Sequence, residues 1–164
     1  GYPASSIKAK ASASGAGLTS QQTHPTFRRL LASRGEERCV VDLVIDGAPA
    51  VDLEKVSFGA VRVDTQREIA ANKICTLLGR SEIKDLVDLQ ALVHAGIDLE
   101  RALADALQKD AGADPATLAW ILGELSIAPG ARLPGGVDAS ALEAFRQGLV
   151  HRLLALAYAG ARRT

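Results

Sequence analysis

Apolar positions change their spacing partway along the chain. Between Phe27 and Val63 they fall in short runs that are typical of β-strands. From Gln66 onward they recur every three or four residues, as they do on one face of a helix. The pattern therefore predicts a small β-rich region followed by a helical C-terminal half, which is an α+β fold rather than an alternating α/β fold.

The β-rich region is predicted to begin with a hairpin. Its strands are residues 27–32 and 38–45, and Gly35 lies in the turn between them. One or two further short strands are expected around four alternating apolar residues: Val56, Phe58, Val61 and Val63.

Capping residues divide the helical half into five predicted helices. Thr65 and Glu68 have the capping-box spacing and start a helix over 66–78, which Gly79 is expected to interrupt. Ser81 is expected to cap a second helix that ends at residue 94, before Gly96.

Three aspartates mark the starts of the remaining helices. Asp98 caps a helix over 99–110, and Asp114 with the following proline caps one that ends near residue 125. Asp138 caps a final long helix that runs to residue 161. We therefore predict three parts: residues 1–24 as a disordered or atypical segment, 25–64 as a small sheet, and 65–164 as a helical region.

Composition narrows the class of protein. The 164 residues are 48% hydrophobic but only 4% aromatic, and Lys+Arg equals Asp+Glu at 19 each. Such a balanced chain does not attract polyanions as a whole, so an anionic partner must be held by a local cluster of cations. Cys39 and Cys75 match no metal or redox spacing and are predicted to be buried thiols of a cytoplasmic protein. No apolar run approaches the roughly 20 residues of a membrane span.

Two basic residues on the first predicted helix are in unusual surroundings. Lys73 has Ile69 and Leu77 as its neighbours one turn away, and Arg80, seven residues on, lies almost directly above it. The two cations could grip an anion together. The structural alternative is that both stems lie on apolar surface while both heads reach water.

Acids on the next predicted helix raise a similar question. Asp85 falls inside the apolar stripe of this helix, and Asp88 lies at its edge, three residues on. A carboxylate in such a place is costly to bury unless it is paired. It could belong to an active site, or it could be a structural anion in the first helical turn that pairs with Arg80 or Lys84.

A third acid lies in the predicted hairpin. Asp42 stands between Val41 and Leu43, where it could hold a metal ion or simply face water, since side chains alternate along a strand. Mg²⁺ takes carboxylate oxygens together with phosphate and water. If Asp42, the helix cations and the acids Asp85 and Asp88 meet, they would form a site suited to nucleotidyl transfer.

Three stretches carry a family resemblance. "VDLVID", then "VDTQREIAANKICTLLGRSEIKDLVDLQAL", then "LAWIL" resemble the AbiEii/AbiGii-type nucleotidyltransferases, the toxins of bacterial type IV toxin–antitoxin systems. The resemblance runs from about Pro25 to the last helix. It implies a polymerase-β-like nucleotidyltransferase fold, Mg²⁺ with an NTP as substrate, tRNA as a candidate acceptor, and a cognate antitoxin as partner.

The resemblance also implies roles for individual residues. Lys73, with Arg80 and Lys84, would bind the phosphates of the NTP. Asp85 and Asp88 would be the catalytic acids, and Asp42 would be a metal ligand.

One family feature has no counterpart here. The family begins with a glycine-rich turn and a strand-borne Asp-x-Asp, but the first acid of this chain is Glu36 and no Asp-x-Asp occurs in it. We therefore expect that the chain lacks the family's usual beginning, or is a decayed copy, and that it has little or no activity alone. The alternative hypothesis is a non-catalytic helical module that binds protein or nucleic acid.

Overall fold

The computed structural model describes residues 15–45, 47–59 and 61–162, and it divides the chain into two compact units, 1–48 and 49–164. The sequence placed a boundary between residues 64 and 65 instead. Residues 49–64 belong with the helices because their backbone and side chains bond to α2 (Gln66–Arg80) and α4 (Leu99–Lys109). Part of the expected 1–24 segment, residues 1–14, lies outside the described residues.

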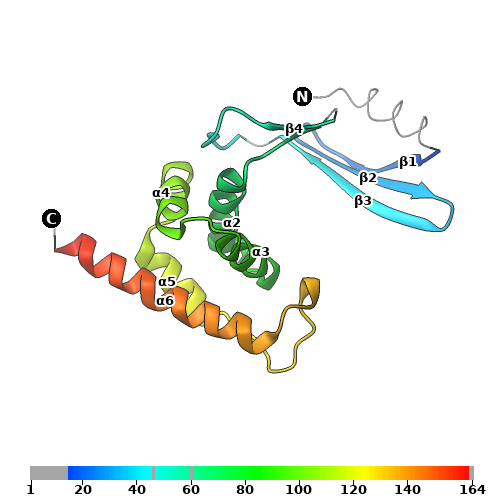
Figure 1. The fold of residues 1–164 in the computed structure, drawn as a ribbon. Coiled ribbons are helices and arrows are strands. Elements are labelled where there is room, and N and C mark those ends of the chain that lie inside the picture. The colour runs from blue at the N-terminus through cyan, green and yellow to red at the C-terminus, as the bar shows by residue number, and fades with distance from the viewer. Residues whose placement is uncertain (1–14, 46, 60, 163–164) are drawn as a thin grey trace. The chain divides into compact units, whose positions relative to one another are not determined.

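The N-terminal unit is an antiparallel three-stranded sheet. Its strands β1 (Gly17–Thr23), β2 (Phe27–Arg34) and β3 (Glu37–Val44) lie side by side in chain order (Figure 1). β2 and β3 confirm the predicted hairpin, and Gly35, with a φ of 60°, begins the two-residue turn between Arg34 and Glu37. β1 was not predicted, and it lies in the part of the chain that the sequence indicated to be disordered or atypical.

The second unit begins with a short ribbon and continues as helices. β4 (Val56–Phe58) and β5 (Val61–Val63) pair antiparallel, as the alternating apolar residues indicated. The helices are α2, α3 (Ile83–His94), α4, α5 (Pro115–Glu124) and α6 (Ala139–Ala161), with a 3₁₀ turn, η1 (Pro134–Gly136), before the last. The fold is therefore α+β, as the order of apolar patterns predicted.

Side-chain caps explain where most helices begin. The carboxylates of Asp98, Asp114 and Asp138 each accept a backbone N–H from the first turn of their helix. α3 ends in a Schellman motif, because the N–H of Gly96 bonds to Val93 O and that of Ile97 bonds to Leu92 O. Gly96 has the positive φ, 97°, that this motif requires.

The junction between α2 and α3 differs from the prediction. α2 continues through Gly79 to Arg80, and Ser81 ends it in the left-handed conformation with a φ of 48°. Glu82, rather than Ser81, precedes α3. The extra residues of α2 carry Arg80 onto the helix, where it can point in the same direction as Lys73.

One apolar core holds the helices together. α2 packs against α3, α4 and α5, while α6 packs against α3 and α5 (Figure 1). The largest fully buried apolar side chains of this core are Ile74, Leu77, Leu86, Leu89, Leu118, Leu122, Leu142 and Leu153. Trp120 is 69% exposed on α5, so its large ring lies outside this core. The prediction that Cys39 is a buried thiol is wrong, because Cys39 is exposed on β3. Within the described part of the chain, no helix has the length and hydropathy needed to cross a bilayer.

Candidate functional site

Asp85 is the centre of a charged cluster between α2 and α3. Its side chain is fully buried, yet it accepts hydrogen bonds from two cations of α2. Arg80 donates through Nε at 2.9 Å and Nη2 at 3.1 Å, and Lys73 donates through Nζ at 3.1 Å. The sequence prediction that Lys73 and Arg80 point the same way is confirmed, because both reach one carboxylate.

Asp88 is on the open side of the same cluster. Its Oδ2 lies 2.5 Å from Lys73 Nζ, so that the lysine bridges Asp85 and Asp88. The Asp88 side chain is 49% exposed and that of Lys73 is 25% exposed. The head of Lys73 therefore does not simply extend into water: it is shared between one buried acid and one accessible acid.

Lys84 lies beside the cluster rather than inside it. Its Nζ is 2.7 Å from Glu82 Oε2, and Glu82 Oε1 is 3.7 Å from Arg80 Nε. Glu82 thus links Lys84 to the rim of the cluster, while the buried acid is paired with Arg80 and Lys73.

Electrostatics keep the cluster ionised. Burial alone would raise the pKa of Asp85, but the hydrogen bonds from Arg80 and Lys73 outweigh it and lower the pKa below its usual value. Burial likewise opposes the charge on Lys73, whereas Asp88 and Asp85 raise its pKa overall. The cluster is therefore a set of ion pairs at neutral pH, in which neither Lys73 nor Asp85 is poised to exchange a proton.

Asp42 has a different partner in the N-terminal unit. It lies on β3 opposite Arg29 of β2, and the guanidinium bonds to both carboxylate oxygens at 2.7 Å. These hydrogen bonds lower the pKa of Asp42. Both oxygens are engaged in the structure, so a metal ion would have to compete with a bidentate arginine for them.

The described residues offer Mg²⁺ few ligands. No group of three or more His, Cys, Asp or Glu side chains in the described ranges could hold a metal ion. Of the two acids on α3, Asp85 is fully buried and paired with two cations, which leaves Asp88 as the accessible one. A Mg²⁺ ion usually takes one or two carboxylates together with substrate phosphates and water, and Asp88 by itself is a minimal ligand set.

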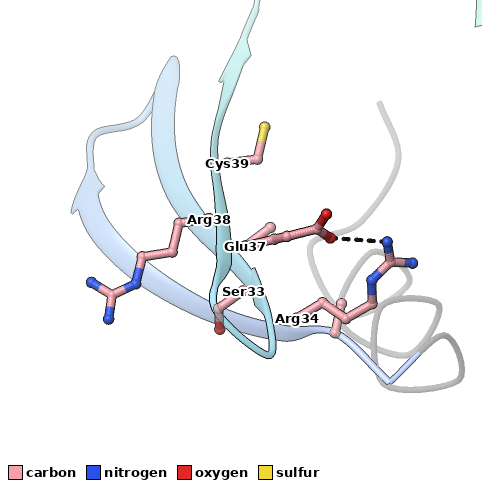
Figure 2. A pocket seen from close by; sticks show the side chains of 7 residues that line it. Ser33, Arg34, Glu37, Arg38 and Cys39 are labelled. Atoms are coloured by element: carbon pink, nitrogen blue, oxygen red, sulfur yellow. Dashed lines mark hydrogen bonds and ion pairs between the residues drawn. The ribbon is translucent and has the colours of Figure 1, made fainter.

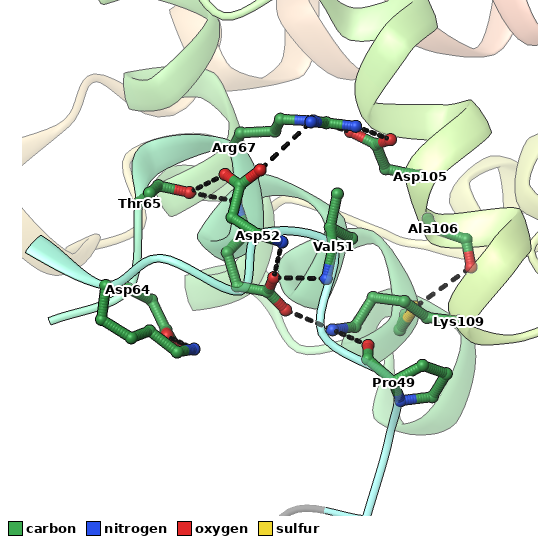
Figure 3. Close-up of polar contacts among 12 residues, drawn as sticks. Pro49, Val51, Asp52, Asp64, Thr65, Arg67, Asp105, Ala106 and Lys109 are labelled. Carbon is green, nitrogen blue, oxygen red and sulfur yellow. Dashed lines mark hydrogen bonds and ion pairs between the residues drawn. The ribbon is translucent and has the colours of Figure 1, made fainter.

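A second charged cluster, which the sequence did not reveal, joins residues 49–52 to the helices (Figure 3). The Glu68 carboxylate accepts the backbone N–H groups of Val51 at 2.7 Å and Asp52 at 3.0 Å, and it pairs with Lys109 of α4. Lys109 also donates to Pro49 O at 2.8 Å. The Lys109 and Glu68 side chains are only 4% and 3% exposed, so this pair is closed to solvent.

Arg67 extends the second cluster along α2. It donates to both carboxylate oxygens of buried Asp105 at 2.6 Å and to Asp52 at 3.1 Å, while Thr65 also bonds to Asp52 (Figure 3). The capping-box spacing of Thr65 and Glu68 pointed to a helix start, which is confirmed. It gave no sign that Glu68 bonds to a lysine 41 residues away.

The N-terminal unit also has a hollow of about 530 Å³ beside its hairpin turn (Figure 2). Its lining contains none of the predicted site residues. It is formed by Ala16, Ala32, Ser33, Arg34, Glu37, Arg38 and Cys39. Figure 2 shows Arg34 and Glu37 paired on one side of β3 while Arg38 extends on the other. The pair is 69% and 78% exposed, so its net electrostatic contribution is small.

Comparison with known proteins identifies a family for this chain. The family model described as "Nucleotidyl transferase AbiEii toxin, Type IV TA system" matches residues 5–164. No curated protein and no solved structure gives a significant match. The match spans both units and includes the Lys73–Asp85 cluster.

Proposed function

Because this chain belongs to the AbiEii family of nucleotidyltransferase toxins of type IV toxin–antitoxin systems, we propose that it takes part in nucleotidyl transfer from an NTP to an acceptor. tRNA is the candidate acceptor, and a cognate antitoxin is the candidate partner. The observation that carries the proposal is the convergence of Lys73, Arg80, Asp85 and Asp88 on one cluster between α2 and α3.

Each residue of the cluster has a different role in this proposal. Lys73 and Arg80 are the cations that bind phosphate oxygens, with Lys84 at the rim. Asp85 is a positioning residue, because it is fully buried and fixes both cations through three hydrogen bonds. Asp88 is the acid that substrate can reach, since half of its side chain is exposed.

Mg²⁺ is the metal that we propose to enter with the NTP. Asp42 stays a proposed ligand, although Arg29 holds both of its oxygens in the structure. The described residues gather no group of three or more ligating side chains for a metal ion, and the sequence contains no Asp-x-Asp. We therefore propose that this chain alone binds NTP phosphates but transfers nucleotide slowly or not at all.

Two measurements test this function. Labelled NTP binding is measured by equilibrium dialysis for the unmodified chain and for Lys73→Gln, and nucleotide incorporation into tRNA is followed with and without Mg²⁺. We expect NTP binding that falls about tenfold or more in Lys73→Gln, because a charge-assisted contact is removed. Absence of Lys73-dependent binding would refute the assigned phosphate site. Robust incorporation would instead refute the claim that the chain is inactive alone.

A non-catalytic interaction module is the second candidate. Complete burial of Asp85 against Arg80 and Lys73 favours it, because this is also how a structural ion pair looks. Under this hypothesis Asp85→Asn destabilises the fold, and no NTP binds to the unmodified chain at any accessible concentration. The same dialysis experiment therefore separates the two functions.

A further inference from the structure

We propose that Asp88 competes with phosphate ligands for Lys73. In the unliganded protein the Asp88 carboxylate pairs with the Lys73 ammonium group, and a phosphate oxygen replaces it when ligand binds. The ligand class, a polyphosphate, rests on the proposed function. The competition itself rests on the contacts of the two acids with Lys73.

The two acids that pair with Lys73 differ in how easily they can be displaced from it. Asp85 is fully buried and accepts three hydrogen bonds from Arg80 and Lys73, so it cannot turn away without leaving a charge in the protein interior. Asp88 lies at the surface, and its carboxylate faces Lys73 at 2.5 Å with half of the side chain exposed. Asp88 can therefore rotate into water at little cost, since exposed ion pairs contribute little to stability.

Charge counting shows why a phosphate would replace Asp88. Lys73 and Arg80 face Asp85 and Asp88, so the contacts balance while Asp88 is in place. Once the Asp88 carboxylate turns away, one N–H donor of Lys73 loses its acceptor. The remaining charges of Lys73, Arg80 and Asp85 then sum to one net positive charge. A phosphate group brings more negative charge and more acceptor oxygens than one carboxylate, so it is the stronger partner for that lysine.

The experiment measures binding of inorganic tripolyphosphate by calorimetry, in EDTA and about 0.15 M salt so that no metal bridges the ligand and long-range effects are screened. The variants are Asp88→Asn, Asp88→Ser and Lys73→Gln. Glu124→Gln is the matched control, because it removes one negative charge from an exposed position at the end of α5. Circular dichroism confirms that each variant is folded.

We expect both Asp88 variants to bind tripolyphosphate about twofold more tightly than the unmodified chain, which is the loss of one exposed ion pair expressed as affinity. Glu124→Gln should change affinity by less than about 1.5-fold. Lys73→Gln should lose the binding. Unchanged or weaker binding in the Asp88 variants overturns the proposal, as does binding that does not depend on Lys73 or no binding to any variant.

The outcomes separate this inference from the proposed function. If the Asp88 variants bind tripolyphosphate more tightly but no variant binds NTP, the competition is correct and the proposed function is wrong. If NTP binding depends on Lys73 while the Asp88 variants leave tripolyphosphate affinity unchanged, the proposed function stands and the competition is wrong.

Discussion

Two lysine–carboxylate clusters on α2 differ in how they meet solvent. In the closed cluster, Glu68 and Lys109 are both nearly inaccessible, and the carboxylate also accepts the N–H groups of Val51 and Asp52. In the open cluster, the buried acid Asp85 pairs with Lys73, which remains 25% exposed and also pairs with Asp88. The Glu68–Lys109 pair is shielded from solvent, whereas the Lys73–Asp88 pair is accessible to it.

The difference assigns them different roles. In the closed cluster each hydrogen-bonding atom is committed to a structural partner, so the cluster fixes residues 49–52 against α2 and α4. In the open cluster the fixed acid orients the cations and the accessible acid can be exchanged. A buried lysine–acid pair is thus not by itself a sign of function; in our proposal, the accessible third member, Asp88, is what distinguishes an anion site from a structural ion pair.

Breaking the closed cluster should have the largest effect on stability. Lys109→Met leaves the Glu68 carboxylate buried without its cation, and such a loss costs about 3–5 kcal/mol. Urea denaturation at pH 7 measures it. Arg152→Met is the matched control, because the Arg152–Glu100 pair is 52% and 57% exposed and should contribute less than about 0.5 kcal/mol. Equal losses in both variants would contradict the distinction between closed and exposed pairs.

Neutralising the buried acid of the open cluster should cost less. Asp85→Asn removes the charge that Lys73 and Arg80 face, but these cations are 25% and 46% exposed and can turn toward water. We expect a loss of about 2 kcal/mol, between the values for a buried and an exposed pair. A loss as large as that of Lys109→Met would show that the Asp85 cluster is as closed as the Glu68–Lys109 cluster. Asp85→Asn should also weaken tripolyphosphate binding, since Asp85 positions both cations.

The stability that the open cluster provides should depend on pH in a defined direction. The pKa of Asp85 is lowered from 3.8, so its contribution is fully present above that value and is lost as pH falls further. The pKa of Lys73 is raised from 10.5, so its contribution is present below 10.5 and is lost as pH rises through the higher folded value. The difference in unfolding free energy between the unmodified chain and Asp85→Asn should therefore be constant from pH 5 to 9 and shrink below about pH 3.8. Urea titrations at pH 7 and pH 3 measure this, and an equal difference at both would contradict it.

The sequence predicted the fold class because local signals were strong. The capping aspartates at positions 98, 114 and 138 each start the helix they were expected to start, and Gly35 forms the predicted turn. The prediction failed at Gly79, because one glycine costs a helix only about 1 kcal/mol and packing of α2 outweighs that. β1 was missed because its polar residues carry no apolar alternation and its partner is another strand.

The candidate site was predictable only in part. Helical spacing correctly put Lys73 and Arg80 on one side of α2, and the apolar stripe marked Asp85 as a buried acid. The sequence pattern did not indicate that Lys109 is buried in an ion pair, because its partner Glu68 lies on another helix, 41 residues away. Spacing within one helix reveals neighbours along that helix, whereas contacts between helices depend on packing that a periodic pattern does not encode.

The smallest expected effect on stability is that of Asp88→Asn, and it is also the sharpest test of the open side. The Asp88 side chain is half exposed and its pair with Lys73 can be replaced by water, so the unfolding free energy should change by no more than about 0.5 kcal/mol. Asp85→Asn, three residues away and facing the same lysine, should cost several times more. Urea denaturation of the two variants side by side measures the ratio. If Asp88→Asn destabilises the chain as much as Asp85→Asn does, Asp88 is a fixed structural partner of Lys73, and the open side that distinguishes this cluster from the Glu68–Lys109 pair does not exist.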